Sequence, residues 1–234
     1  MNTRTRRSPA GHGVGPIGCR SCDLNEICRL AGVLAYDAGR SRQSTGALRT
    51  VPAGTSLYRA GEKAHMLYAV RQGMLKTVRV SPAGDEQVLE LNTPGEVLGL
   101  EALGTGHYAN DVIALQHVVC CELPLRMLAE QEQAAREVST ALIRLLARAA
   151  APRAHPARGP IRQRVTNFLL DLAARLADRG LDGRQFPLGL SRQEMADLLD
   201  TRIETVSRVM QKLHREQAIR VRGSRVNLLS LAAE

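Results

Sequence analysis

Five cysteines are the residues of this 234-residue chain whose type and spacing are best suited to holding a metal. Three form the pattern Cys19-x2-Cys22-x5-Cys28, and Cys120 and Cys121 follow about 90 residues later. Three thiolates on one short segment and a fourth from elsewhere can enclose a 4Fe-4S cluster, because each of its irons takes one protein sulfur. The same sulfurs could bind tetrahedral zinc, or the cysteines could be surface thiols beside a buried pair. The spacing alone leaves these three alternatives open.

A second group of candidate residues lies on a predicted helix that follows residue 202. Its polar residues recur at spacings of three and four, which puts them on one face: Glu204, Ser207, Arg208 and Gln211. Its apolar residues supply the predicted packing side: Ile203, Val206, Val209, Met210 and Leu213. A recognition helix needs this division, because its polar side must offer donors and acceptors to base edges in the major groove. A solvated surface helix with scattered charges is the alternative interpretation.

The charge distribution favours nucleic acid as the partner of this helix. The formal net charge is +9, and residues 123–234 carry 19 Lys and Arg against 12 Asp and Glu. The chain has no Trp, four Tyr and two Phe, so it lacks the aromatic platforms on which single strands and RNA are stacked. We therefore expect duplex DNA, with Arg220, Arg222 and Arg225 available for phosphate contacts.

The elements that must position these residues differ between the two halves. Residues 48–122 contain short apolar runs separated by turn residues, which predicts an antiparallel sandwich or barrel. The runs are Leu48–Val51, Leu67–Val70, Leu75–Val80, Val88–Leu91, Val112–Leu115 and Val118–Leu123. Residues 1–18 are rich in glycine and predict a mobile arm.

From Leu125 the composition predicts a helix that ends near Ala151, because Pro152, Pro156 and Pro160 follow in quick succession. Beyond them, the pattern predicts a helix over 161–179 and a short strand from Phe186 to Leu190.

A helix-turn-helix is predicted next in the chain. Ser191 is a suitable N-cap, and Glu194 three residues later completes a capping box. We expect this first helix to end near Asp200 and a second to run from about Ile203 to Gln217. The alternating tail around Gly223 predicts a two-stranded wing.

Four stretches resemble the FNR group of the cAMP receptor protein superfamily of bacterial transcription regulators. They are Ile203-Glu204-Thr205-Val206-Ser207-Arg208, Gly84-Asp85-Glu86-Gln87, Gly104-Thr105-Gly106-His107 and Cys121-Glu122-Leu123-Pro124, and the resemblance extends from about residue 19 to 229. It implies an α+β fold with a cupin-like antiparallel β-barrel of the cyclic-nucleotide-binding type, a dimerisation helix and a C-terminal winged helix-turn-helix. The implied domains are an arm and cysteine loop (1–32), a sensory barrel (33–124), a dimerisation helix and Pro-rich hinge (125–160) and a DNA-binding domain (161–234).

The resemblance also implies roles for individual residues. Oxygen-labile 4Fe-4S ligands would be Cys19, Cys22, Cys28 and Cys121, with Cys120 as a packed spare thiol. Base readers of a TTGAT-N4-ATCAA palindrome would be Glu204, Ser207 and Arg208, and we add Arg202, Gln211, Lys212 and Arg222 as expected DNA contacts. Two departures from the family pattern are Asp200, where glycine is usual in the turn, and Arg202, where threonine often begins the helix.

The implied partners are double-stranded DNA, a second copy of the chain, and the sigma or alpha subunit of RNA polymerase, with the Asp85-Glu86 tip touching sigma. Cyclic nucleotide is not expected, because the stretch from Gly95 to Asp111 has no arginine to hold a phosphate. Asp23 directly follows a predicted ligand, and we expect its carboxylate to add negative charge to the cluster environment.

Other functional classes have less support in the sequence. The paired acids Asp85-Glu86 have no His or Ser partner for hydrolysis, and a cupin-type enzyme would need a histidine cluster where only His65, His107 and His117 are available. We therefore expect no enzyme. No apolar run is long enough to cross a bilayer, so no membrane association and a cytoplasmic location are expected. The alternative function keeps DNA binding and replaces the sensor by zinc, a thiol switch, haem or a nitric oxide site.

Overall fold

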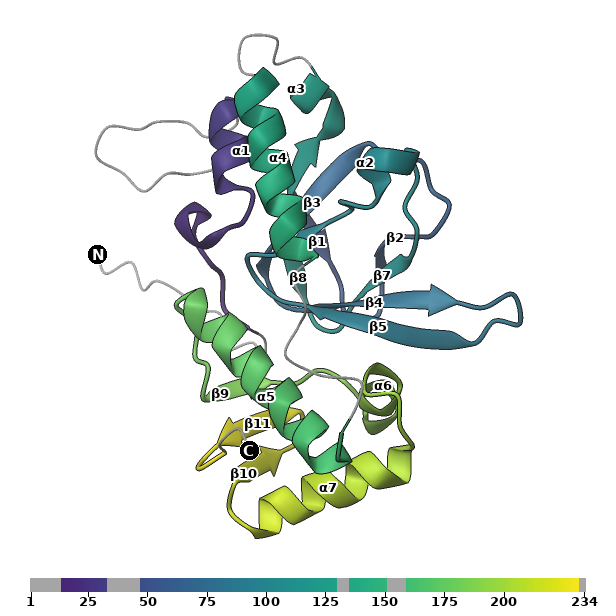
Figure 1. Ribbon diagram of the computed structural model, residues 1–234, viewed down its shortest axis with the longest axis vertical. Coiled ribbons are helices and arrows are strands. Elements are labelled where there is room, and N and C mark those ends of the chain that lie inside the picture. The colour runs from purple at the N-terminus through teal and green to yellow at the C-terminus, as the bar shows by residue number, and fades with distance from the viewer. Residues whose placement is uncertain (1–13, 33–46, 130–134, 151–158, 232–234) are drawn as a thin grey trace, which may run out of the picture.

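The computed structural model describes residues 14–32, 47–129, 135–150 and 159–231. Figure 1 shows a barrel of strands in the N-terminal half, two helices along one side of it, and a smaller helical domain at one end. No helix within these described residues is long and apolar enough to span a membrane. The fold class expected from the family resemblance is confirmed.

The barrel consists of two four-stranded antiparallel sheets, in the orders β1-β8-β3-β6 and β2-β7-β4-β5. Its strands are β1 (Leu48–Val51), β2 (Ser56–Tyr58), β3 (Met66–Gln72), β4 (Leu75–Val80), β5 (Glu86–Asn92), β6 (Val97–Leu98), β7 (Asp111–Ala114) and β8 (Val118–Pro124). The six predicted apolar runs correspond to six of these strands. The prediction missed β2 and β6, which have three and two residues and are too short to show an alternating pattern.

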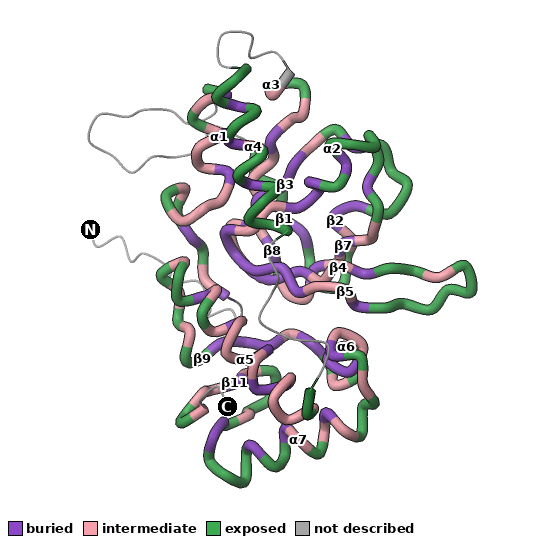
Figure 2. Tube along the Cα trace, viewed as in Figure 1, coloured by how far each residue is buried: buried purple, intermediate pink, exposed green. Residues whose placement is uncertain are grey.

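The alternation of side chains along β3 and β8 separates two apolar clusters. Val70 and Cys120 point into the barrel core, whereas Ala69 and Cys121 contribute to a second cluster on the outer face. Figure 2 shows β3 as largely buried and β8 as alternating between buried and intermediate residues, while the far end of the β4–β5 hairpin is exposed. The outer face is therefore covered along β3 and β8, whereas β1 is mostly exposed.

This face is covered by helical segments that come before and after the barrel strands in the sequence. A single turn of 3-10 helix (Cys19–Ser21) and α1 (Asn25–Leu30) precede the strands, and α2 (Ala102–Thr105), α3 (Leu125–Ala129) and α4 (Ala135–Ala149) lie within or after them. Leu24 and Ile27 pack with Leu145 of α4 on the outer cluster. In Figure 1, α1 and α4 lie side by side.

The helix predicted from Leu125 to near Ala151 is described over two ranges, α3 and α4, and residues 130–134 between them lie outside the described residues. The end of α4 at Ala149 is close to the expected end. The predicted hinge residues Pro152 and Pro156 lie outside the described residues.

The C-terminal domain follows the predicted order. It contains α5 (Ile161–Asp178), β9 (Gln185–Pro187), α6 (Arg192–Leu198), α7 (Ile203–Arg215), β10 (Ile219–Arg222) and β11 (Arg225–Leu228). The predicted wing is confirmed and is extended to three strands, because β9 pairs with β11. A core that includes Phe168, Met195 and Val206 joins α5, α6 and α7.

The expected mobile arm is wrong for its last residues. Val14 and Ile17 are 5% and 7% exposed. The Gly73 N–H donates to the Val14 carbonyl at 3.2 Å, and the Ile17 N–H donates to the Arg71 carbonyl at 2.9 Å. The hydrogen bonds attach this segment to the barrel, and the Val14 side chain packs in the apolar cluster of the C-terminal domain, which glycine content alone did not indicate. Residues 1–13 lie outside the described part.

Candidate functional site

The N-terminal cysteines lie on a folded segment that local hydrogen bonds hold in place. Cys19 begins the 3-10 turn, Cys22 ends it and Cys28 lies on α1. The Cys22 N–H and the Asn25 side-chain amide both donate to the Cys19 carbonyl, at 3.1 and 2.9 Å. The chain therefore bends back on itself between the first and second cysteines.

This cysteine loop, defined here as residues 19–28, meets β8 on the outer face of the barrel. Cys19, Cys22 and Cys121 line one small cavity together with Ala69 and Arg71. Cys28 completes the group, since it packs against the same outer apolar cluster as Cys22 and Cys121. The four cysteines that the resemblance implies as ligands are thus brought together from two segments far apart in sequence.

Burial controls the ionisation of these thiols. It raises the pKa of Cys22 to about 12, with smaller contributions from neighbouring Cys28 and Cys121. It also raises the pKa of Cys28 to about 12, helped by Cys121 and Cys19. A metal or cluster must therefore displace protons from these sulfurs when it binds.

The donor set consists of sulfur, which both inorganic groups that the spacing left open can take as a ligand. Among the residues that the structure describes, no three His, Cys, Asp or Glu side chains are grouped so that they could hold one metal ion. Tetrahedral zinc would need all four sulfurs about 2.3 Å from a single point, whereas in a cubane cluster each sulfur binds a different iron. The thiols of Cys19, Cys22, Cys28 and Cys121 are chemically suitable for either group.

Cys120 has different surroundings from its neighbour. It is 0% exposed within the barrel core, and burial raises its pKa to about 12. Because consecutive strand residues face opposite sides, this inward position directs Cys121 to the cysteine loop.

Sequence reasoning missed Arg71, which lines the cysteine cavity. Its positive charge counteracts the effect of burial, which on balance raises the pKa of the Cys121 thiol. Arg71 lies where the β3–β8 register shifts, between Val70 and Gln72. A bulge of this kind redirects a side chain and leaves no periodic signal in a sequence.

The helix-turn-helix is stabilised by the predicted capping box. The Glu194 N–H donates to the Ser191 hydroxyl at 3.1 Å, and the Ser191 N–H donates to the Glu194 carboxylate at 2.7 Å. Asp200 in the turn has a φ of +45°, the left-handed conformation for which glycine is usual in the family and which Asp tolerates. Both sequence predictions about this motif are confirmed.

The predicted recognition surface is largely solvent-exposed. Its exposed members are Arg202, Glu204, Arg208, Gln211 and Lys212 on or beside α7, and Arg222 on β10, while Ser207 is half-buried. Val206, Met210 and Leu213 pack inward as predicted. Ile203 does not: it is 37% exposed, because it lies in the first turn of the helix, beyond the edge of the core.

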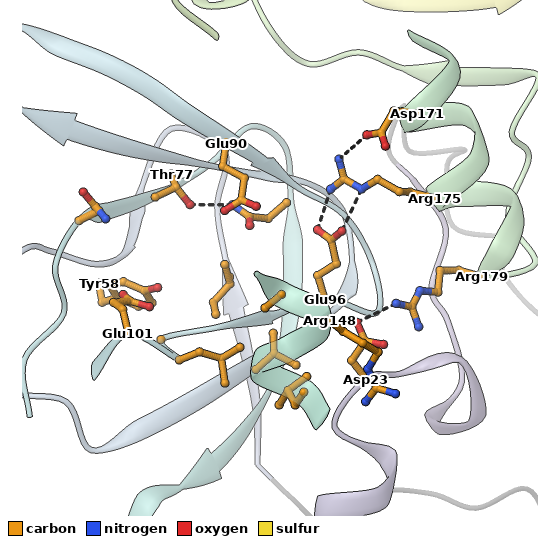
Figure 3. A pocket seen from close by; sticks show the side chains of 18 residues that line it. Asp23, Tyr58, Thr77, Glu90, Glu96, Glu101, Arg148, Asp171, Arg175 and Arg179 are labelled. Carbon is orange, nitrogen blue, oxygen red and sulfur yellow. Dashed lines mark hydrogen bonds and ion pairs between the residues drawn. The ribbon is translucent and has the colours of Figure 1, made fainter. Parts of the chain in front are cut away.

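A larger cavity, of about 450 Å³, lies between the barrel, α4 and α5 (Figure 3). Its carboxylates are Asp23, Glu90, Glu96, Glu101 and Asp171, and its arginines are Arg148, Arg175 and Arg179. Arg175 forms an ion pair with Glu96 at 2.7 Å, and Arg179 forms one with Asp23 at 2.7 Å. The wall is therefore more acidic than basic, and two of its guanidinium groups are engaged by carboxylates.

Comparisons with known proteins agree for both halves of the chain. Residues 163–233 match the model of the Crp-like helix-turn-helix domain, and residues 48–133 match that of the cyclic nucleotide-binding domain. The chain is 29% identical over 230 residues to the transcriptional activator protein Anr of Pseudomonas aeruginosa, covering 97% of this chain and 92% of that protein. It is 23% identical over 227 residues to the fumarate and nitrate reduction regulatory protein of Escherichia coli, covering 91% and 86%.

Solved structures show the same relationship. A CRP-family transcriptional regulator from Thermus thermophilus is 31% identical, with a TM-score of 0.62, and covers 79% of this chain and 93% of that one. FixK2 from Bradyrhizobium japonicum shares the fold, with a TM-score of 0.63 at 24% identity over 78% and 92% of the two chains. The barrel, the Crp-like helix-turn-helix and these relatives establish that the chain belongs to the CRP/FNR superfamily of DNA-binding transcription regulators.

Proposed function

We propose that this chain is an oxygen-responsive transcription regulator that holds a 4Fe-4S cluster on Cys19, Cys22, Cys28 and Cys121. One observation carries the proposal: these four thiols converge on the outer face of β8, although about 90 residues separate the third from the fourth. The burial of Cys120 in the barrel core supports leaving it out of this set. The names of the Anr and fumarate and nitrate reduction relatives are in keeping with such a role.

When bound, a 4Fe-4S cluster would supply iron–sulfur bonds that oxygen can break. The chain's own residues supply the rest of the response. The four sulfurs fix the cysteine loop against β8, and Leu24 and Ile27 within that loop pack on Leu145 of α4. Retention or loss of the sulfur ligation therefore changes what α4 packs against.

Dimer formation through α4 is the second part of the proposal. Ile143 and Leu146 are 66% and 41% exposed on this helix, although both are large apolar side chains. Burying them against the same helix of a second copy would remove apolar surface from water. A dimer also places two copies of α7 on the two halves of a palindrome.

The DNA contacts are assigned to the exposed face of α7 and to the wing. Glu204, Ser207 and Arg208 would read a TTGAT-N4-ATCAA site. Arg202, Gln211, Lys212 and Arg222 would add further base or phosphate contacts. Arg can bind guanine through two hydrogen bonds, and a carboxylate can accept from cytosine, which is the chemistry these exposed side chains offer.

Contact with RNA polymerase through the Asp85-Glu86 turn completes the proposal for an activator. We assign no cyclic nucleotide to the large cavity. Its acidic wall would repel a phosphate, and the stretch from Gly95 to Asp111 offers no arginine.

The test is purification without air, followed by iron and sulfide analysis, visible absorbance and a gel shift on the palindrome. We expect brown protein with stoichiometric iron that binds the duplex, and we expect both the colour and the tight binding to be lost in air. Colourless protein with stoichiometric zinc would instead support the alternative sensor. Protein that binds the duplex equally well before and after aeration would contradict oxygen sensing.

A further inference from the structure

Two arginines reach from the DNA-binding domain to the sensory half of the molecule. Arg175 lies on α5, and Arg179 lies one helical turn later, at the C-terminal end of that helix. Arg175 binds β5 and the turn that follows it. It donates to both carboxylate oxygens of Glu96, at 2.9 and 2.7 Å, and to the Leu91 carbonyl at 2.6 Å. Arg175 is therefore tied to the barrel itself.

Arg179 has different partners, and both hydrogen bonds of its guanidinium go to the cysteine loop. Its Nη1 donates to the Ser21 carbonyl at 2.6 Å and its Nη2 to the Asp23 carboxylate at 2.7 Å. Ser21 lies between Cys19 and Cys22, and Asp23 directly follows Cys22. Figure 3 shows the Arg179 side chain extending from α5 to Asp23. We call these two hydrogen bonds the Arg179 contact.

The surrounding backbone is shaped to let this contact form. The Asp23 N–H donates to the Gly95 carbonyl at 2.9 Å, which holds the loop beside the turn after β5. Gly95 has a φ of +98°, and a Cβ at that position would lie 2.6 Å from Nε of Arg179. A side chain at this position would displace the guanidinium from where it lies, and the positive φ also favours glycine.

The Arg179 contact is also shielded from water. The Arg179 and Asp23 side chains are 22% and 23% exposed. A charge-assisted hydrogen bond in such a position is stronger than an ion pair on an open surface. The contact further shows that the charge of Asp23, which the sequence analysis expected to act on the cluster, is paired with a guanidinium.

We propose that Arg179 is a positioning residue that makes the orientation of the DNA-binding domain depend on the state of the cysteine loop. This inference rests on the proposed function. Both acceptors of Arg179 lie in the part of the cysteine loop that precedes α1, and the regular structure there is a single 3-10 turn. The path of this segment therefore depends on whether its cysteine sulfurs are ligated. Ligated sulfurs keep the two acceptors in place for Arg179. Released sulfurs free the loop, and the end of α5 loses its attachment.

The test compares wild type, Arg179→Gln, Asp23→Asn, the double variant and Arg184→Gln. Arg184→Gln is the matched control, because it removes the same charge from an exposed position of the same domain. Each protein is purified without air and analysed for iron. Its affinity for the palindrome is then measured with the iron present and after its removal, and the ratio of the two affinities is the quantity compared.

We expect Arg179→Gln and Asp23→Asn to keep their iron and to lower the ratio by about fivefold or more, the lower end of typical coupling between sites. The double variant should lower it no further than the single ones, and Arg184→Gln should leave it unchanged. Hydrogen exchange gives a second readout that does not depend on DNA. In wild type, amides at the end of α5 should exchange faster once iron is removed. In Arg179→Gln they should exchange at this faster rate even with iron present.

The outcomes separate the two proposals. Wild type without iron, or with a ratio of one, would contradict the proposed function and the regulatory role of Arg179 with it. Iron-containing wild type with a large ratio that Arg179→Gln and Asp23→Asn both retain would overturn the Arg179 inference alone. Additive losses in the double variant would also overturn it, because residues that act through one contact do not add.

Discussion

The cysteine site and the helix-turn-helix are built in opposite ways. The helix-turn-helix uses contiguous residues: the capping box that starts α6, the turn at Asp200 and α7 all lie within the 25 residues from Ser191 to Arg215. The cysteine site needs a loop near the N-terminus to meet a barrel strand about 90 residues later, with two helices packed over both. The difference indicates that the helix-turn-helix is encoded locally, whereas the cysteine site depends on the tertiary fold.

The largest expected effect tests the cysteine site, which depends on the tertiary fold. Cys121→Ala should yield protein without iron, because it removes the one ligand that the barrel supplies. Cys120→Ala should retain iron and lose only about 1 to 3 kcal/mol of unfolding free energy, because it leaves a small cavity in the barrel core. Iron analysis and thermal unfolding of both variants provide the measurement. Equal iron contents in the two would contradict the assignment of Cys121.

The next largest expected effect tests the helix-turn-helix, which is encoded locally. Arg208→Ala should weaken binding to the palindrome by about 1 to 3 kcal/mol for each half-site, since a bidentate contact from arginine to guanine would be lost. Binding to a scrambled duplex should change little. Arg184→Ala serves as the control for the loss of one positive charge. A gel shift in which Arg208→Ala weakens both duplexes equally would show that this residue contacts phosphate and not bases.

The smallest effect concerns an ion pair that links the barrel to the helix-turn-helix. Lys76 of β4 binds Glu194 of α6 at 2.7 Å. Burial would raise the pKa of Glu194, but hydrogen bonds from Lys76 and Ser191 outweigh it and hold that pKa below its ordinary value. The stability from this carboxylate is therefore present above its unfolded pKa of about 4.3 and is lost as pH falls through the lower folded value.

We expect Glu194→Gln to cost about 0.5 kcal/mol of unfolding free energy near neutral pH, since Gln can still complete the capping box. The difference from wild type should vanish in acid. Denaturant unfolding at several pH values measures it, and Lys76→Met should reproduce the same pH-dependent loss. A difference that persists at about pH 3 would mean that the charge of Glu194 is not what matters.

The sequence by itself determined the parts of this protein that depend on neighbours along the chain. The period of Val206, Met210 and Leu213, the capping box and the turn residue Asp200 each act over four residues or fewer, so the helix-turn-helix could be predicted almost to its ends. The apolar runs and turns likewise located six barrel strands. The exposed Ile203 marks the limit, because a helical period cannot tell where the core beneath the helix ends.

Only the tertiary structure decided which residues meet across the chain. No pattern around Arg71 indicates the bulge that turns it toward Cys121, and nothing near Arg179 indicates a partner such as Asp23, 156 residues away. The burial of Val14 has the same origin. Contacts of this kind depend on how sheets and helices stack, and that stacking is fixed by the summed burial of many side chains and not by any local pattern.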